Sequence, residues 1–172
     1  MKRLATLRHA KSSWADPGMA DFDRPLNDRG REAARDLGRE MTRRRMRFDL
    51  VLASPAQRVR ETLDGVGQDF GLEREVRFEP PIYDASVATL FELIYALPEN
   101  CESALLAGHN PGLHELVLDL TDPDDAGLRD RIRGKYPTAA LAVVELAPER
   151  WAEVRPGSGR IVELVLPRDL AD

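Results

Sequence analysis

The sequence predicts a single α/β domain built as three layers, with a mostly parallel central sheet between two layers of helices. Short apolar runs alternate with stretches of helical periodicity through residue 120, and two strand-like runs containing Val and Ile follow at 139–146 and 160–166. A chain of 172 residues is long enough to bury one continuous core and too short for two well-built ones. We therefore expect residues 1–172 to form one domain.

The first strand and the first helix are joined by a polar loop. Residues 4–7 predict a short apolar strand that runs directly into this loop. From Asn27 onward, apolar residues recur at three- and four-residue spacing with charged residues between them, which is typical of a helix. Either Asn27 or Asp28 can cap its N-terminus. We expect one stripe of this helix to pack on the sheet.

The second strand and the second helix follow each other without a gap. The run DLVLA at 49–53 is compact and apolar, which suits a buried strand. Ser54 followed by Pro55 is typical of an N-cap and the first helical turn. The sequence therefore predicts that the next helix begins here.

The later elements are predicted from similar signals. Residues 76–78 are a candidate third strand, and Ser86 caps a helix that Pro98 stops. The run SALLA at 103–107 predicts another buried strand, and a helix follows through 113–120. The two late strand-like runs are expected to pair with each other, either completing the sheet or forming a dimer edge.

Residues able to do chemistry follow three of the predicted strands. Arg8 and His9 come after the first strand, Arg58 lies near the start of the helix after the second, and His109 follows the fourth. Because ligands in open α/β sheets bind beyond the carboxyl ends of the strands, we expect these four side chains to meet at one edge.

Two histidines and two arginines together suit phosphoryl transfer. Catalysis of that reaction depends mostly on positioning the phosphoryl group and on neutralising its oxygens. Arginine presents a rigid, permanently charged fork to phosphate oxygens, and a neutral imidazole can act as a nucleophile near pH 7. No metal or other cofactor is needed for this chemistry.

Four ordered motifs resemble one known family. LRHAKSSW is similar to the Arg-His-Gly signature of the histidine phosphatase superfamily, and ASPAQRVRET is similar to its second-arginine motif. With AGHNPGL and DFDRPLNDRG, the combination resembles the small bacterial phosphohistidine phosphatase branch over about the first 120 residues. The resemblance implies a phosphoglycerate mutase-like core without the long helical insertion of the mutases.

The resemblance also implies a role for each residue. His9 would be the nucleophile that forms a phosphohistidine intermediate. Arg8, Arg58 and His109 would bind the phosphoryl oxygens, and water would then hydrolyse the intermediate. No cofactor is implied.

Several positions depart from the wider superfamily. Ala10 stands where Gly is usual, and Ala15 stands where the mutases place a phosphate-contacting Asn. Asn110 stands where the acid phosphatases carry the Asp that protonates the leaving group. The positional candidate for the general acid is Asp84, in PIYD, although the motif match there is weak.

The missing insertion and the uncertain acid favour a phosphohistidine substrate, carried by a protein that approaches an open site. A phosphoramidate leaves readily once its ring is protonated, whereas an alkoxide needs a positioned proton donor. Two alternatives stay open. One is a general phosphomonoesterase of small metabolites that uses Asp84 or a similar acid, and the other is a phosphate-binding module without catalysis.

Composition excludes other functions and locations. The net charge of −5 argues against a general nucleic-acid binder. Cys101 is the sole cysteine, so no intramolecular disulfide forms and a reducing cytoplasm is the expected location. No apolar run is long enough to span a membrane. A metal site built from His9, His109 and His114 has no supporting carboxylate or spacing pattern, and we expect none.

Overall fold

The computed structural model describes residues 1–172 except 73–75, 126 and 171–172. In these described residues, six strands form one sheet in the order β3-β2-β4-β1-β5-β6. The strands are β1 (Lys2–Arg8), β2 (Leu50–Ala53), β3 (Val76–Phe78), β4 (Ser103–Gly108), β5 (Leu141–Leu146) and β6 (Gly159–Val165). Strands β3, β2, β4 and β1 run parallel, and β5 and β6 are antiparallel additions beside β1. The predicted α/β fold with a mostly parallel sheet is confirmed.

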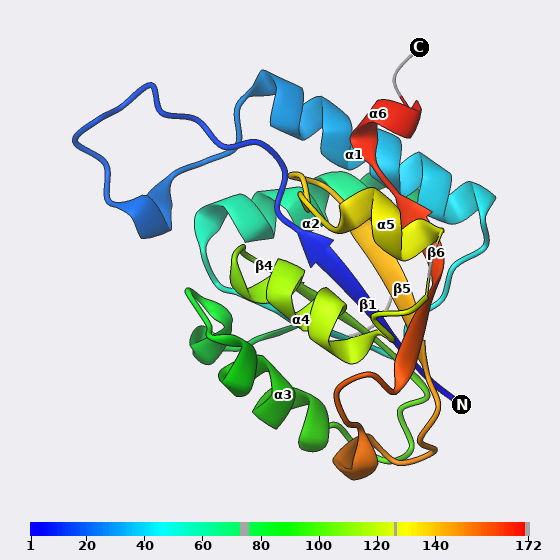
Figure 1. Cartoon of the computed structure of the whole chain (residues 1–172). Helices are drawn as coiled ribbons and strands as arrows, with labels where there is room; N and C mark the ends of the chain where they lie inside the picture. Colours follow the sequence, from blue (N-terminus) through cyan, green and yellow to red (C-terminus); the bar gives the residue numbers. More distant parts are fainter. Residues whose placement is uncertain (73–75, 126, 171–172) are drawn as a thin grey trace.

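Helices cover both faces of the sheet (Figure 1). The α-helices are α1 (Asp28–Arg43), α2 (Gln57–Phe70), α3 (Val87–Tyr95), α4 (Gly112–Leu120), α5 (Leu128–Ile132) and α6 (Pro167–Leu170). Short 3-10 turns are η1 (Asp21–Asp23), η2 (Pro80–Ile82) and η3 (Trp151–Glu153). Helices α1 and α2 lie on one face, and α3 and α4 lie on the other. No helix in the described ranges is long and apolar enough to cross a membrane.

Alternate residues of the central strands supply two separate cores. Within β4, Leu105 packs with α1 and α2, whereas Leu106 packs with α3 and α4. This alternation follows from the two-residue period of a strand, and it requires apolar residues on both faces. It explains why the strands are continuous apolar runs in the sequence.

Helices α1 and α2 approach each other very closely. A Cβ atom on Gly38 would lie 2.4 Å from the carbonyl oxygen of Val66, and one on Gly65 would lie 2.7 Å from the Cβ of Ala34. The absence of side chains at these two glycines therefore lets the backbones pack together. This contact fixes α2, which carries Arg58, against α1.

Most predicted element boundaries agree with the structure. The Asn27 side chain accepts a hydrogen bond from the amide of Gly30 (2.8 Å), and Ser86 accepts one from Thr89 (3.2 Å), so both predicted caps are confirmed. The late strands pair with each other and complete the sheet beside β1.

The predicted cap of α2 is wrong. The helix begins at Gln57 with Ala56 at the N-cap position, and Ser54 lies before it. The Ser54 hydroxyl instead accepts from the amide of Ala56 and contacts the ring of His109 (2.7 Å). A serine that looked like a capping residue thus belongs to the region where the strands end.

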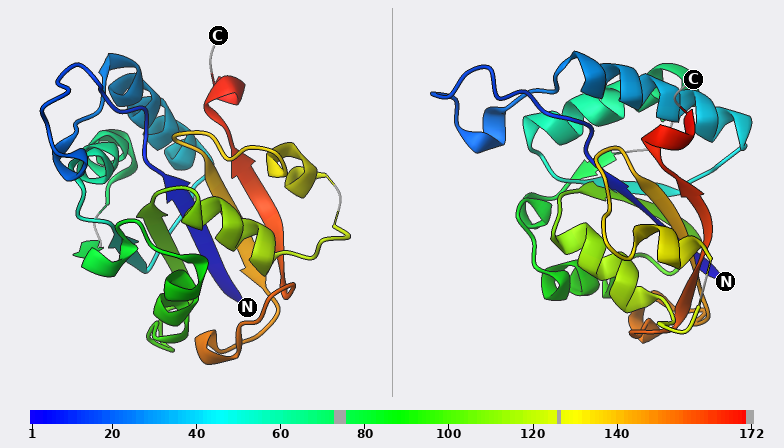
Figure 2. Two further views of the ribbon diagram at one scale, coloured as in Figure 1. Left: turned by 60° about the vertical axis from the view of Figure 1, so that its left-hand side comes forward. Right: turned by 45° about the horizontal axis from the view of Figure 1, so that its top comes forward.

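A long segment connects β1 to α1 and projects from the body of the molecule (Figures 1 and 2). We call residues 11–26 the arm. Its two ends are joined by an isolated antiparallel bridge between Ser12 and Leu26. The arm carries Trp14, whose ring is 75% exposed and lies under the guanidinium group of Arg24, 3.6 Å from it. The segment thus brings η1 toward the edge of the sheet that holds the carboxyl ends of β1, β2 and β4.

Candidate functional site

The predicted site residues meet at one edge of the sheet. Strands β1, β2 and β4 are parallel and end there. The amide of His9 donates to the carbonyl of Gly108 (3.1 Å), and that of Ser54 donates to Ala107 (3.0 Å). These bonds extend the strand ladder by one residue. They place His9 and Ser54 on either side of the end of β4, where His109 follows.

The ring of His9 is buried and held in one orientation. Its side chain is 8% exposed, and Nδ1 donates to the carbonyl of Ala10 (2.7 Å). The amide of Ala10 in turn donates to the hydroxyl of Thr62 (2.9 Å), which donates to the carbonyl of Arg58 (2.6 Å). With Nδ1 protonated, Nε2 carries the lone pair of the neutral ring. Nε2 is therefore the nitrogen able to attack phosphorus.

His109 lies beside His9. The two ring centroids are 5.3 Å apart, with the ring planes tilted by 55°. Nε2 of His109 is 2.7 Å from the Ser54 hydroxyl, and its Nδ1 is buried without a partner. If Ser54 donates to Nε2, Nδ1 carries the proton and is a free donor.

Both predicted arginines keep a donor unused. Arg8 donates from Nη1 to the carbonyl of Tyr136 (3.0 Å), and Arg58 donates from Nη1 to the carbonyl of Asp21 (2.8 Å). The Nε atoms of both are buried without partners. Among the described residues, four buried side-chain nitrogen or oxygen atoms lack a hydrogen-bond partner. Three of these four belong to the site, namely Nε of Arg8, Nε of Arg58 and Nδ1 of His109. Buried donors of this kind are costly unless they serve a ligand, and a phosphoryl group supplies the oxygens they lack.

The site keeps its histidines neutral. Burial, assisted by the charge of Arg58, lowers the pKa of His109 to about 3. Burial also lowers the pKa of His9 to about 4, with Arg58 and Arg8 adding to the effect and the Ala10 hydrogen bond opposing it. Burial and the neighbouring Arg58 likewise lower the pKa of Arg8. At neutral pH the site therefore contains two uncharged imidazoles beside two guanidinium groups.

Asp21, in the arm, was not predicted as a site residue. Its Oδ2 accepts from Nη2 of Arg58 (3.1 Å) and from the hydroxyl of Tyr83 (2.6 Å), and its Oδ1 accepts from Nε of Arg24 (3.1 Å). The hydrogen bond from Tyr83, with support from both arginines, lowers the pKa of Asp21 to about 2. The same hydrogen bond raises the pKa of Tyr83. Asp21 is therefore a carboxylate that contacts the site and is ionised at neutral pH.

The sequence contained weak signals for these missed residues. Asp21 opens the motif DFDRPLNDRG, and Thr62 closes the motif ASPAQRVRET. Both residues thus lie inside motifs that resemble the family, but no periodic pattern in the sequence indicates that they contact the site. Ser54 was interpreted as a helix cap because its local sequence fits one.

Asp84 lies at the edge of the site, next to Tyr83, with its carboxylate in solvent. It is exposed, its φ angle is 52°, and its carboxylate makes no hydrogen bond or ion pair within the described ranges. The ring of the preceding residue, Tyr83, packs nearly perpendicular to that of His109 (85°), with centroids 5.4 Å apart. Asp84 as the general acid stays a prediction.

His114 has a different environment. Its Nε2 donates to the carbonyl of Ile132 (2.6 Å), and its ring stacks on Tyr136. No group of three or more His, Cys, Asp or Glu side chains suited to a metal occurs among the described residues.

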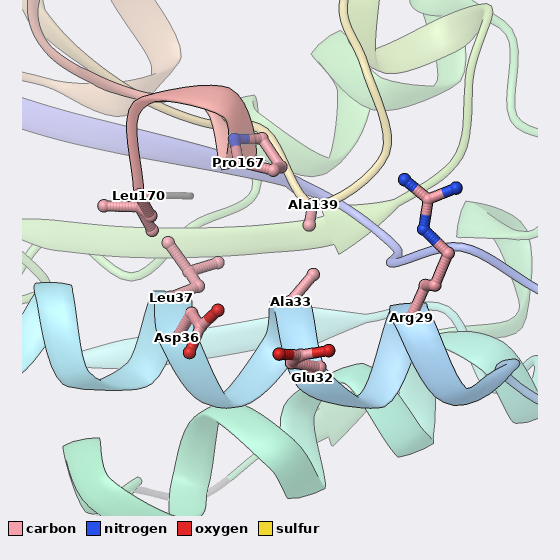
Figure 3. Close-up of a pocket in the computed structure, with 8 residues that line it drawn as sticks. All are labelled: Arg29, Glu32, Ala33, Asp36, Leu37, Ala139, Pro167 and Leu170. Atoms are coloured by element: carbon pink, nitrogen blue, oxygen red, sulfur yellow. The ribbon is translucent and has the colours of Figure 1, made fainter. Parts of the chain in front are cut away.

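A groove of about 460 Å³ lies between α1 and α6 (Figure 3). Its lining residues are Arg29, Glu32, Ala33, Asp36, Leu37, Ala139, Pro167 and Leu170. None of the predicted site residues lines it. Its lining residue Ala139 is next to the site, because the Ala139 amide donates to the carbonyls of Arg8 and His9 (3.0 Å each).

Known proteins resemble this chain over nearly its whole length. An uncharacterized protein of Mycobacterium tuberculosis, Rv1276c, is 35% identical across 94% of this chain and 100% of its own length. The structure of SixA from Agrobacterium tumefaciens, a proposed phosphohistidine phosphatase, is 31% identical, with a TM-score of 0.82 and coverage of 96% of this chain and 98% of that one. The corresponding protein from Nakamurella multipartitia is 26% identical, with a TM-score of 0.81 and 96% of both chains covered.

The model of branch 1 of the histidine phosphatase superfamily matches residues 4–85. That range includes Arg8, His9 and Arg58, and the similarity to SixA extends beyond it to the segment that carries His109. The chain belongs to the histidine phosphatase superfamily, and it is a phosphatase of the SixA-like type within it.

Proposed function

We propose that this phosphatase hydrolyses phosphohistidine without a metal, through a covalent intermediate on His9. The observation that carries the proposal is the state of the His9 ring: Nδ1 is bound to the Ala10 carbonyl, and the opposite nitrogen is free beside three unused buried donors. A nucleophile and the groups that neutralise phosphoryl oxygens are thus present together.

In the first step, Nε2 of His9 attacks phosphorus, and the bond to the leaving group breaks as the new N–P bond forms. Nε of Arg8, Nε of Arg58 and Nδ1 of His109 donate to the equatorial oxygens, where negative charge is spread in the transition state. In the second step, water attacks the same phosphorus, the electron pair of the N–P bond returns to His9, and phosphate leaves with both protons of the water. The Ala10 carbonyl holds the Nδ1 proton throughout.

The choice of phosphohistidine rests on the ionised state of Asp21, the carboxylate that contacts Arg58. Asp21 contacts the site but is ionised, so it has no proton to give to an alkoxide. A phosphorylated imidazole that is protonated on its distal nitrogen leaves as a neutral ring and needs no further proton. The SixA protein of Agrobacterium tumefaciens, which is similar along its length, is itself a proposed phosphohistidine phosphatase.

The first test compares phosphate release from a phosphohistidine-bearing protein and from p-nitrophenyl phosphate, with EDTA present. We expect the parent to release phosphate from the phosphohistidine protein preferentially and His9→Ala to release none. Acid quenching should destroy, and alkaline quenching preserve, a labelled phosphoenzyme on the parent. Thermal melting of His9→Ala would check that the variant is folded.

Each other result changes the conclusion. Full activity of His9→Ala would exclude the covalent mechanism, and loss of parent activity in EDTA would exclude metal-independent catalysis. Preference for the ester would indicate a general phosphomonoesterase with Asp84 as the acid candidate. Phosphate binding without release from either substrate would indicate a binding module.

We propose that the protein acts in the cytoplasm, on the basis of its single thiol, Cys101. Cys101 is buried, donates to the carbonyl of Ser103 (3.3 Å), and has a pKa that burial raises. An unreactive structural thiol without a disulfide partner suits a reducing compartment. Labelling of Cys101 in freshly lysed and then denatured cells would check that it is reduced.

A further inference from the structure

Three partly exposed residues that contact one another border the site, and we call Asp21, Phe22 and Tyr83 the rim. Behind them, His9, His109 and Arg58 are 8%, 6% and 5% exposed. The side chain of Asp21 is 48% exposed although it contacts Arg58, and Phe22 is 39% exposed. The rim is therefore partly open to solvent and in direct contact with Arg58 and His109, so a leaving group at the site can contact it.

The rim has one carboxylate and two aromatic rings. The Tyr83 ring is nearly perpendicular to that of His109 (85°), and Phe22 packs nearly perpendicular to Tyr83 (81°) with centroids 5.1 Å apart. The Tyr83 hydroxyl fixes the carboxylate of Asp21 at the end of the same ring. Aromatic faces attract cations, and a carboxylate attracts them more strongly. A flat, positively charged group matches both features.

On this basis we infer that the rim recognises the protonated imidazole ring of phosphohistidine, with Asp21 as the specificity-determining residue. The inference rests on the proposed function and extends it to the leaving group. The distal N–H of the substrate ring faces the Asp21 carboxylate, and the ring lies against Phe22 and Tyr83. When the substrate N–P bond breaks, its electron pair returns to the ring nitrogen. The ring then leaves neutral, with its distal proton unchanged.

This recognition also explains why the carboxylate is kept ionised. Two arginines and a tyrosine hydroxyl donate to Asp21, so it can stabilise a positive charge but cannot protonate an ester oxygen. A phosphate ester with a neutral aromatic leaving group gains the ring contacts and none of the charge interaction. The rim therefore discriminates by charge between leaving groups of similar shape.

The test uses two peptides of one sequence, carrying phosphohistidine or phosphotyrosine, and measures kcat/KM for each. Asp21→Asn should lower the ratio of phosphohistidine to phosphotyrosine kcat/KM by about tenfold at pH 6, the effect of one modest charge interaction. Any effect of Asp21→Asn that acts through Arg58 alone should change kcat/KM equally for both substrates, so it cancels in the ratio. Asp23→Asn is the matched control, since Asp23 lies in the same 3-10 turn and its carboxylate makes no hydrogen bond or ion pair within the described part of the chain. It should leave the ratio unchanged.

Phe22→Leu provides a second variant that leaves the Asp21 ion pairs in place. It should lower the same ratio by about threefold through loss of the aromatic face. As pH rises and the substrate ring loses its proton, the preference for phosphohistidine should decline in both proteins, because the unprotonated ring is a poor leaving group. The tenfold gap between the parent and Asp21→Asn should narrow over the same range, because Asp21 no longer faces a cation. If the parent hydrolyses phosphohistidine and Asp21→Asn has the same kcat/KM ratio as the parent, the inference about the rim is overturned and the proposed function stands. No hydrolysis of the phosphohistidine peptide by the parent would overturn both.

Discussion

The ring of His109 is held by one hydroxyl group, which makes its orientation testable at the level of a single residue. Ser54→Ala removes the contact with Nε2. Either ring nitrogen can then carry the proton, so Nδ1 is no longer fixed as the donor. We expect kcat to fall about tenfold, which corresponds to about 1.4 kcal/mol of transition-state stabilisation. Steady-state kinetics on p-nitrophenyl phosphate measures this.

Ser103→Ala is the control for Ser54→Ala. The Ser103 hydroxyl also accepts from a backbone amide, that of Asp49, and it donates to the carbonyl of Arg47, but it lies at the opposite end of β4. Each variant should lose about 1 kcal/mol of stability. If Ser103→Ala lost as much activity as Ser54→Ala, the loss would reflect weakened folding and not the orientation of His109.

At the scale of elements, the contact between α1 and α2 depends on glycine. Gly38→Ala would bring a Cβ atom 2.4 Å from the Val66 carbonyl oxygen, and backbone cannot yield as a flexible side chain does. Overpacking costs typically about 1–3 kcal/mol, more than the roughly 1 kcal/mol that alanine gains over glycine within a helix. We expect a lower urea midpoint and lower activity, because α2 positions Arg58 and Thr62.

Gly67 offers the matched comparison within α2. A Cβ atom there would meet only the side chain of Leu72, at an ordinary distance of 3.7 Å. Gly67→Ala should therefore stabilise the protein by up to about 1 kcal/mol and leave activity unchanged. Equal urea midpoints for the Gly38 and Gly67 variants would show that the close approach of the helices is not what glycine provides.

At the scale of the whole molecule, the two buried histidines make stability depend on pH. Their folded pKa values, about 4 for His9 and about 3 for His109, lie below the ordinary value of about 6.5. The unfolded chain therefore binds protons first as pH falls. The contribution of these neutral rings is complete above about pH 6.5 and declines below it, by up to about 1.4 kcal/mol per pH unit for each histidine.

Urea unfolding between about pH 5 and pH 7 measures this slope. The carboxylates of Asp21 and Glu40 have pKa values lowered to about 2, so their contributions decline only below the ordinary carboxyl range and do not interfere. The double variant His9→Asn/His109→Asn should show a flatter profile. An unchanged slope in that variant would place the proton uptake elsewhere in the chain.

The sequence was informative where local pattern decides structure and less so where distant segments meet. Apolar runs and caps such as Asn27 predicted the strands and main helices, because burial and capping act within a few residues. Arg8, His9, Arg58 and His109 could be predicted together, since parallel strands end at one edge. Ser54 and Asp21 were missed because their partners lie 55 and 37 residues away, and no local spacing encodes such contacts.

The position of β1 between β4 and β5 has a consequence for how the enzyme is made. His9 is translated early, yet its amide bonds to Gly108, and the preceding residue, Arg8, bonds to Ala140. The ribosome must therefore deliver nearly the whole chain before β1, which leads into the proposed nucleophile His9, has both neighbouring strands. A polypeptide released after β4 would hold the signature motifs and still lack one side of the strand that positions them. Premature termination anywhere before β5 should thus yield inactive fragments, with no partially functional enzyme among them.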